Sequence, residues 1–145
     1  MQKRLKFEHR YKVSADRLFA LVIDLDALEA VSKPLLQIHH LPSGPVRQGQ
    51  GIDVAYSLFG LFPQRPYRMF IRRCDATALR LRSEEHGVGI QRLVHEIEVS
   101  PDGNSSVLRE WIEVDAGWRT QIVAACVWVL FHWRHRVRLR LLGLV

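Results

Sequence analysis

Residues 93–114 read LVHEIEVSPDGNSSVLREWIEV, a stretch with the pattern of two strands joined by a tight turn. Apolar and polar residues alternate on both sides of Asp102-Gly103, and alternation with a period of two predicts strands that bury one face. Asp-Gly is also a preferred pair for a two-residue hairpin turn. With this pair at the turn, the numbers of paired residues sum to 205, so His95 is predicted to lie directly opposite Glu110.

His95 and Glu110 both fall on the more apolar face of the predicted hairpin, together with Leu93, Ile97 and Ile112. An imidazole beside a buried carboxylate can form a charge-assisted hydrogen bond that holds one tautomer. Such a pair can move protons or orient a ligand, but it can equally be a satisfied polar pair in the core. The sequence therefore offers His95 and Glu110 as the candidate catalytic residues and leaves the structural alternative open.

Short alternating segments on both sides of this hairpin predict further strands. Their connections after Pro34 are too short for parallel crossovers, which need a dozen or more residues, so the sheet is predicted to be antiparallel. The strands are expected near residues 5–13, 35–41, 51–58, 66–74, 78–85, 90–99 and 106–114.

Two short helices are expected after the first strand. Ser14 is a preferred N-cap and Asp16 lies in the first turn, where the helix dipole favours an anion, so a helix is predicted to run to about Asp24. A second helix, capped by Asp26, should end before Pro34, because the residue before a proline is pushed out of the helical region.

The last segment, from about Trp118 to Leu142, contains no Gly or Pro and predicts one long, largely buried helix. Arginines crowd its end, where cations complement the helix dipole. Its buried side is expected to carry Ile122, Cys126, Val129, Leu130, Trp133, Val137 and Leu141.

This order of elements resembles the helix-grip fold of the START-like (SRPBCC) superfamily, which includes polyketide cyclases and dehydrases and plant pathogenesis-related ligand carriers. The resemblance covers nearly the whole chain, and its most specific motifs are residues 93–99, 106–114 and 131–136. It implies one α+β domain over residues 1–145, in which a curved antiparallel sheet of about seven strands grips the C-terminal helix. It also implies a cavity between sheet and helix that holds an apolar or amphipathic small molecule.

The leading functional interpretation is binding of such a molecule, without evident catalysis. The alternative is an aromatase, cyclase or dehydratase type of enzyme that uses His95 and Glu110 for proton transfer. A second alternative is a membrane-peripheral lipid-binding protein, in which an apolar hairpin tip (Ser57–Pro63) or the Arg-rich C-terminus touches lipid; the tip could instead act as a lid. The candidate ligand-binding residues are Phe7, His9, Tyr11, Tyr56, Phe59, Phe62, Met69, His95, Glu110 and Trp133.

The composition and the missing motifs argue against several other functions. The net charge of +6 does not by itself indicate nucleic acid, and the arginines of the outward strand faces lack the interleaved aromatic residues that stack on bases. No Gly-rich phosphate loop or nucleophile elbow occurs, and His9, Glu110 and His95 could hold a metal only with a fourth ligand that nothing fixes. We therefore expect no cofactor and no metal.

The two cysteines, Cys74 and Cys126, lie far apart in the sequence, which favours a reduced, cytoplasmic protein. The longest apolar run, Ile122 to Phe131, is shorter than the roughly 20 residues of a membrane-spanning helix, so no transmembrane segment is expected. The pattern of residues 93–114 is similar to that of bacterial members of the superfamily. We expect either a monomer or a homodimer.

Overall fold

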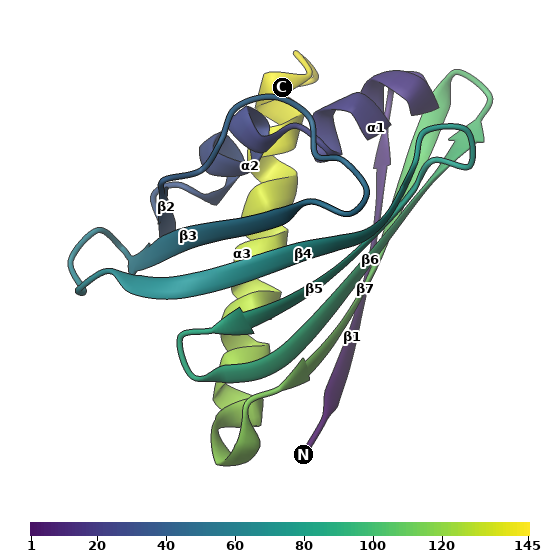
Figure 1. The fold of residues 1–145 in the computed structure, drawn as a ribbon. Coiled ribbons are helices and arrows are strands. Elements are labelled where there is room, and N and C mark those ends of the chain that lie inside the picture. Colours follow the sequence, from purple (N-terminus) through teal and green to yellow (C-terminus); the bar gives the residue numbers. More distant parts are fainter.

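One antiparallel sheet of seven strands forms most of the structure, a computed structural model that describes all residues from Met1 to Val145 (Figure 1). Its strands lie in the order β1-β7-β6-β5-β4-β3-β2, so the first and last strands of the chain are neighbours. The strands are β1 (Lys3–Tyr11), β2 (Leu36–His39), β3 (Gly51–Leu58), β4 (Arg65–Asp75), β5 (Arg80–Gly87), β6 (Ile90–Asp102) and β7 (Ser105–Asp115).

The helices pack on one side of this curved sheet. The long helix α3 (Thr120–Leu141), preceded by a single 3-10 turn (Gly117–Arg119), runs along the sheet, and α1 (Ala15–Val22) and α2 (Leu25–Ser32) lie near its C-terminal end (Figure 1). This arrangement confirms the predicted α+β architecture of a curved antiparallel sheet, two short helices after the first strand, and a long C-terminal helix.

The caps of the two short helices agree with the sequence in one case and correct it in the other. Ser14 caps α1 as predicted, because its hydroxyl oxygen accepts a hydrogen bond from the Arg17 amide at 3.2 Å. The cap of α2 is Asp24 and not Asp26, since the Asp24 carboxylate accepts from the Asp26 amide at 3.1 Å. The second helix therefore begins two residues before its predicted start, with Leu25 buried in the core.

The hairpin of β6 and β7 has a different register from the predicted one. Paired residues sum to 207, so His95 lies opposite Ile112 and Glu110 lies opposite Ile97. Gly103 and Asn104 are the central turn residues, and Gly103 has a φ of 60°, as the first central residue of a type II′ turn requires. Because the correction moves each partner by two residues, His95 and Glu110 still point to the same inner face.

The buried face of α3 is nearly the reverse of the predicted one. Ile122, Val129 and Leu141 are exposed, and so is Cys126. The helix is apolar almost all round in its first half, so its spacing alone does not identify the inner side. The residues that α3 buries are Thr120, Ala124, Val127, Phe131, Arg134 and Arg138.

The apolar core between sheet and helices is divided into two clusters. The larger contains 19 buried residues, among them Leu18, Met69 and Leu108, and extends under α1 and α2. The smaller contains seven, among them Phe7 and Phe131, and lies under the first half of α3. The interior also contains buried polar side chains, namely Ser32, Ser57, Ser83, Ser106, Glu110, Thr120, Arg134 and Arg138.

Candidate functional site

A group of titratable side chains from β1, β6, β7 and α3 meets inside the molecule. At its centre is Glu110, which β7 places on the inner face of the sheet and which is completely buried. We call this group the Glu110 cluster; it consists of Glu110, His95, Arg138, Tyr11, His135 and His9.

Both oxygens of the Glu110 carboxylate are occupied. His95 Nε2 lies 2.8 Å from Oε2, and Arg138 Nη1 donates to Oε1 at 3.3 Å. The predicted hydrogen bond between His95 and Glu110 is therefore confirmed, although the two residues pair diagonally. Burial raises the pKa of Glu110, but the charge of Arg138 and the hydrogen bond from His95 outweigh it and lower the pKa to about 2. Glu110 is thus ionised at neutral pH.

Two histidines and a tyrosine extend the cluster along β1. The Tyr11 hydroxyl lies 2.6 Å from His135 Nδ1, and the His9 ring stacks on the His135 ring with a centroid distance of 4.0 Å. Burial, together with the neighbouring His135 and Arg138, outweighs the opposing charge of Glu110 and lowers the pKa of His9 to about 4. Burial also lowers the pKa of His135. His9 is therefore neutral at pH 7, and its buried Nδ1 has no hydrogen-bond partner.

A second group of polar side chains lies beside α3, toward β3, β4 and β5. Tyr56 stacks on Tyr67 with a centroid distance of 4.1 Å, and the Tyr67 hydroxyl donates to Glu85 at 2.8 Å. Burial and the nearby charge of Glu85 raise the pKa of both tyrosines. We call this group the Arg134 cluster; it consists of Arg134, Ser32, Tyr56, Tyr67 and Glu85.

Sequence reasoning missed Arg134 and Arg138, because both stand in a run of arginines that suggested only a complement to the helix dipole. The available signal was their spacing of four residues, in line with Phe131, Val127 and Ala124. This row of residues can be assigned to the inner face of α3 only once the buried carboxylate of Glu110 is known to require an opposite charge.

The structure gathers most of the predicted ligand-binding residues on the inner side of the sheet, but not all. Phe59 and Phe62 are exposed at the β3–β4 hairpin tip. Trp133 is half-buried, and its indole N–H donates to the Lys33 carbonyl at 2.7 Å, which ties α3 to the end of α2. The residues found on the inner side are Phe7, His9, Tyr11, Tyr56, Met69, His95 and Glu110.

No group of three side chains suitable as metal ligands comes together anywhere in the structure. The Glu110 cluster instead satisfies its carboxylate with one arginine and one histidine. None of the helices is long and apolar enough to cross a membrane.

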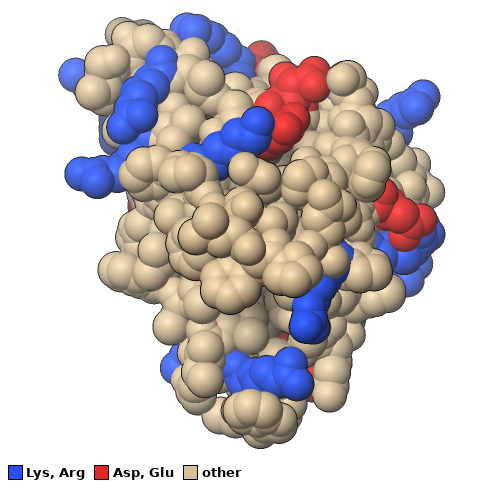
Figure 2. All heavy atoms as spheres, turned by 90° about the vertical axis from the view of Figure 1, so that its left-hand side faces the viewer, with Lys and Arg blue, Asp and Glu red and all other residues tan.

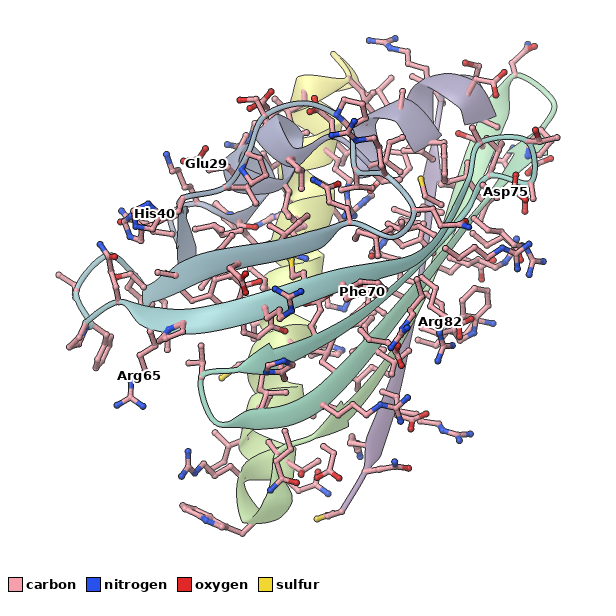
Figure 3. The ribbon with its side chains drawn as sticks, in the orientation of Figure 1. Glu29, His40, Arg65, Phe70, Asp75 and Arg82 are labelled. Atoms are coloured by element: carbon pink, nitrogen blue, oxygen red, sulfur yellow. The ribbon has the colours of Figure 1, made fainter.

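The outer face of the sheet carries the predicted arginines, but acidic residues of adjacent strands pair with them. Arg68 binds Asp53 at 2.7 Å and Arg80 binds Glu98 at 2.7 Å. Arg82, which projects away from α3 in Figure 3, pairs with Glu96. The pairs of Arg80 with Glu98 and of Arg82 with Glu96 line a hollow of about 700 Å³ beside Trp111. This face therefore offers few free cations to a nucleic acid.

Comparison with known proteins gives a match at the level of the fold. Neither a protein-family model nor a curated protein matches the sequence. A protein of Rhodobacter sphaeroides is 15% identical with a TM-score of 0.77, and the match covers 97% of this chain and 92% of that one. A START superfamily protein from Mycobacterium smegmatis is 10% identical with a TM-score of 0.67, covering 92% of each chain.

The similarity extends to plant proteins. The major latex-like protein 151 of Panax ginseng is 12% identical with a TM-score of 0.62, and the match covers 94% of each chain. Identities this low establish the fold alone. The seven-stranded antiparallel sheet curved around α3, together with these matches over nearly the whole chain, shows that this chain has the helix-grip fold.

Proposed function

We propose that the chain binds a small amphipathic molecule between α3 and the inner face of the sheet. The observation that carries this proposal is the polar interior. Glu110, Arg134 and Arg138 are buried in the region that a simple core would fill with apolar side chains. Burying charges costs several kcal/mol per ion, and charged groups inside a core are therefore candidates for a functional site. The helix-grip fold adds support, because the resemblance described above implies a ligand cavity at the same place.

The electrostatics of Glu110 favour binding over proton transfer. A carboxylate with a pKa of about 2 neither donates a proton nor readily accepts one at neutral pH, and both of its oxygens are occupied. Glu110 therefore serves to fix the ring of His95 and the guanidinium of Arg138. In an enzyme of the cyclase or dehydratase type, His95 alone would have to carry the proton.

Native mass spectrometry of gently purified protein tests this proposal. We expect an added mass of one small molecule on the folded protein. Met69→Trp, which fills the interior from β4, should abolish the added mass, whereas Phe70→Trp, at the next position on the outer face, should retain it (Figure 3). No bound molecule, and no uptake from a mixture of amphipathic compounds, would contradict the proposal, as would equal retention by both variants.

A second candidate function, docking on an anionic membrane surface, is favoured by the exposed side of α3. Trp118 is 80% exposed, Ile122 64%, and Trp128 and Val129 are exposed beside them. Residues 116–145 contain no Asp or Glu, and the exposed side of this segment adds the cations of Arg119, Arg136 and Arg140. Apolar side chains next to arginines, with no acid among them, match a bilayer of anionic lipids.

Vesicle sedimentation distinguishes this docking from other uses of the apolar face. The protein should sediment with phosphatidylcholine vesicles containing phosphatidylglycerol and not with pure phosphatidylcholine. Trp128→Ser on α3 should weaken this binding, whereas Trp111→Ser on the outer face of β7 should not. A dimer in analytical ultracentrifugation that Trp128→Ser dissociates would instead assign the face to a second copy of the chain.

A further inference from the structure

Arg134 and Arg138 are equally buried on the same face of α3, but only one of them has an acidic partner. Arg138 donates to Glu110, whereas no carboxylate oxygen lies within 4.0 Å of the Arg134 guanidinium. Arg134 is 6% exposed; its Nη2 donates to Ser32 at 3.1 Å, and its guanidinium carbon lies 4.9 Å from the centre of the Phe131 ring. Its Nε is buried and has no acceptor at all.

This arrangement is unfavourable in the protein alone. A guanidinium keeps its charge under all ordinary conditions, and a buried charge without a counterion is strongly destabilising. Burial lowers the pKa of Arg134, as expected for a cation removed from water. The two acids whose charges favour the ionised form of Arg134 are already engaged. Glu110 accepts from His95 and Arg138, and Glu85 accepts from Tyr67 at 2.8 Å and from Ser83 at 2.6 Å. The Nε–H without an acceptor therefore indicates a binding site for an anion that the chain itself does not supply.

The surroundings of Arg134 change from polar to apolar toward the β3–β4 hairpin tip. Tyr56, which stacks on Tyr67 in the Arg134 cluster, lies immediately before the β3–β4 hairpin tip (Ser57–Pro63). That tip exposes Leu58, Phe59, Leu61 and Phe62. Figure 2 views the molecule from the side to which this hairpin points, and a broad area without charged side chains occupies the middle of that side. A ligand whose anionic end reaches Arg134 would thus have apolar side chains around its other end.

We infer that Arg134 binds the carboxylate of an amphipathic ligand, which enters beside the β3–β4 hairpin tip and keeps its apolar part against the apolar side chains of that tip. This inference rests on the proposed ligand-binding function and names the class of ligand. Arginine suits the role because Nε–H and the adjacent Nη–H form a fork that matches the two oxygens of a carboxylate. Ser32 of α2 accepts a hydrogen bond from Nη2 and so fixes the orientation of the guanidinium.

Calorimetric titration with decanoate and with 1-decanol tests the inference, because the two probes share an apolar chain and differ in charge. The wild-type protein should bind decanoate at least tenfold more tightly than decanol. Arg134→Leu should reduce this preference to less than about threefold while leaving decanol binding intact. Arg136→Leu, an exposed arginine on the same helix, should keep the preference.

The outcomes separate this inference from the proposal on which it depends. Equal binding of both probes by the wild-type protein, or an undiminished preference in Arg134→Leu, overturns the role of Arg134 but leaves ligand binding standing. Failure to bind either probe contradicts both. The melting temperature gives an independent readout: Arg134→Leu should raise it in the ligand-free protein, because an unpaired buried charge is removed. A purely structural arginine would lower it on removal, and that result would also overturn the inference.

Discussion

Glu110 is a carboxylate that keeps its charge inside the molecule because two partners hold it there. Arg138 supplies the opposite charge at 3.3 Å and His95 supplies a hydrogen bond at 2.8 Å. Replacing one member of such a buried ion pair leaves the other charge uncompensated. This lowers the stability of the fold more than replacing both members does. The contribution of Glu110 is therefore best measured together with that of Arg138.

Glu110→Gln should destabilise the protein by roughly 3 kcal/mol, because it leaves the buried Arg138 without a counterion. The double variant Glu110→Gln, Arg138→Met should be more stable than Glu110→Gln alone, since neither charge remains. Urea denaturation of the wild-type protein, both single variants and the double variant gives the coupling free energy. Additive effects of the two substitutions would show that the residues do not act as a pair.

The histidines of the Glu110 cluster predict how stability depends on pH. The pKa of His9 is about 4 in the folded protein and 6.5 in the unfolded chain, so the unfolded state binds more protons between these values. The free energy of unfolding should therefore fall as the pH is lowered from 6.5 to 4. It should fall further from 4.5 to 2, because Glu110 also has a lowered pKa.

His9→Gln should reduce the decrease in the free energy of unfolding between pH 6.5 and pH 4. The reduction should be on the order of 1 kcal/mol after allowance for solvent screening. The measurement is the melting temperature at a series of pH values. His86→Gln, at an exposed position of β5, is the control and should leave the curve unchanged. A curve for His9→Gln that matches that of the wild-type protein over this range would contradict the prediction.

At the scale of single residues, sequence alternation was sufficient to place His95 and Glu110 on one face, because a two-residue error in register does not change the face. The register itself was not predictable from Asp102-Gly103. Gly103 can occupy the first or the second central position of a turn, and the alternation of the flanking residues is the same for both, so it does not distinguish them.

Among the elements, α3 shows most clearly where sequence patterns stop being informative. Its first half is apolar on every side, so helical spacing does not tell the inner face from the outer one. The inner face carries Arg134 and Arg138, and Arg138 turns inward because it pairs with the buried Glu110. A pattern based on hydrophobicity places arginines outside and therefore selects the opposite side.

Two valines test this orientation of α3 directly. Val127 is 8% exposed and Val129 is 51% exposed. Val127→Ser should cost about 2–3 kcal/mol, because it removes buried methyl groups and buries a hydroxyl. Val129→Ser should change stability by no more than about 0.5 kcal/mol. Thermal unfolding of the two variants is the measurement, and the reverse order of their stabilities would refute the observed orientation.

For the molecule as a whole, the sequence predicted the architecture because the order of elements and the short connections between strands allow few alternatives. The interior was predicted less well. Phe7, Tyr11 and Met69 were recognised as inward-facing from strand alternation. The polar interior was not predicted, because its arginines come from a helix and its carboxylates from strands that are distant in sequence. No local sequence pattern indicates that these residues meet in the folded protein.

From the division of the core into two clusters we expect the two halves of α3 to open with different free energies. The first half of α3 is held mainly by the smaller cluster, with Val127 and Phe131, and the second half by the larger. Backbone amides of residues 121–128 should therefore exchange with deuterium through a smaller opening than those of residues 134–141. A bound molecule that touches both clusters would join them, and the difference in exchange should then shrink. Occupancy of the interior would thus be transmitted to the outer side of α3 as a change in rigidity, without any change in shape.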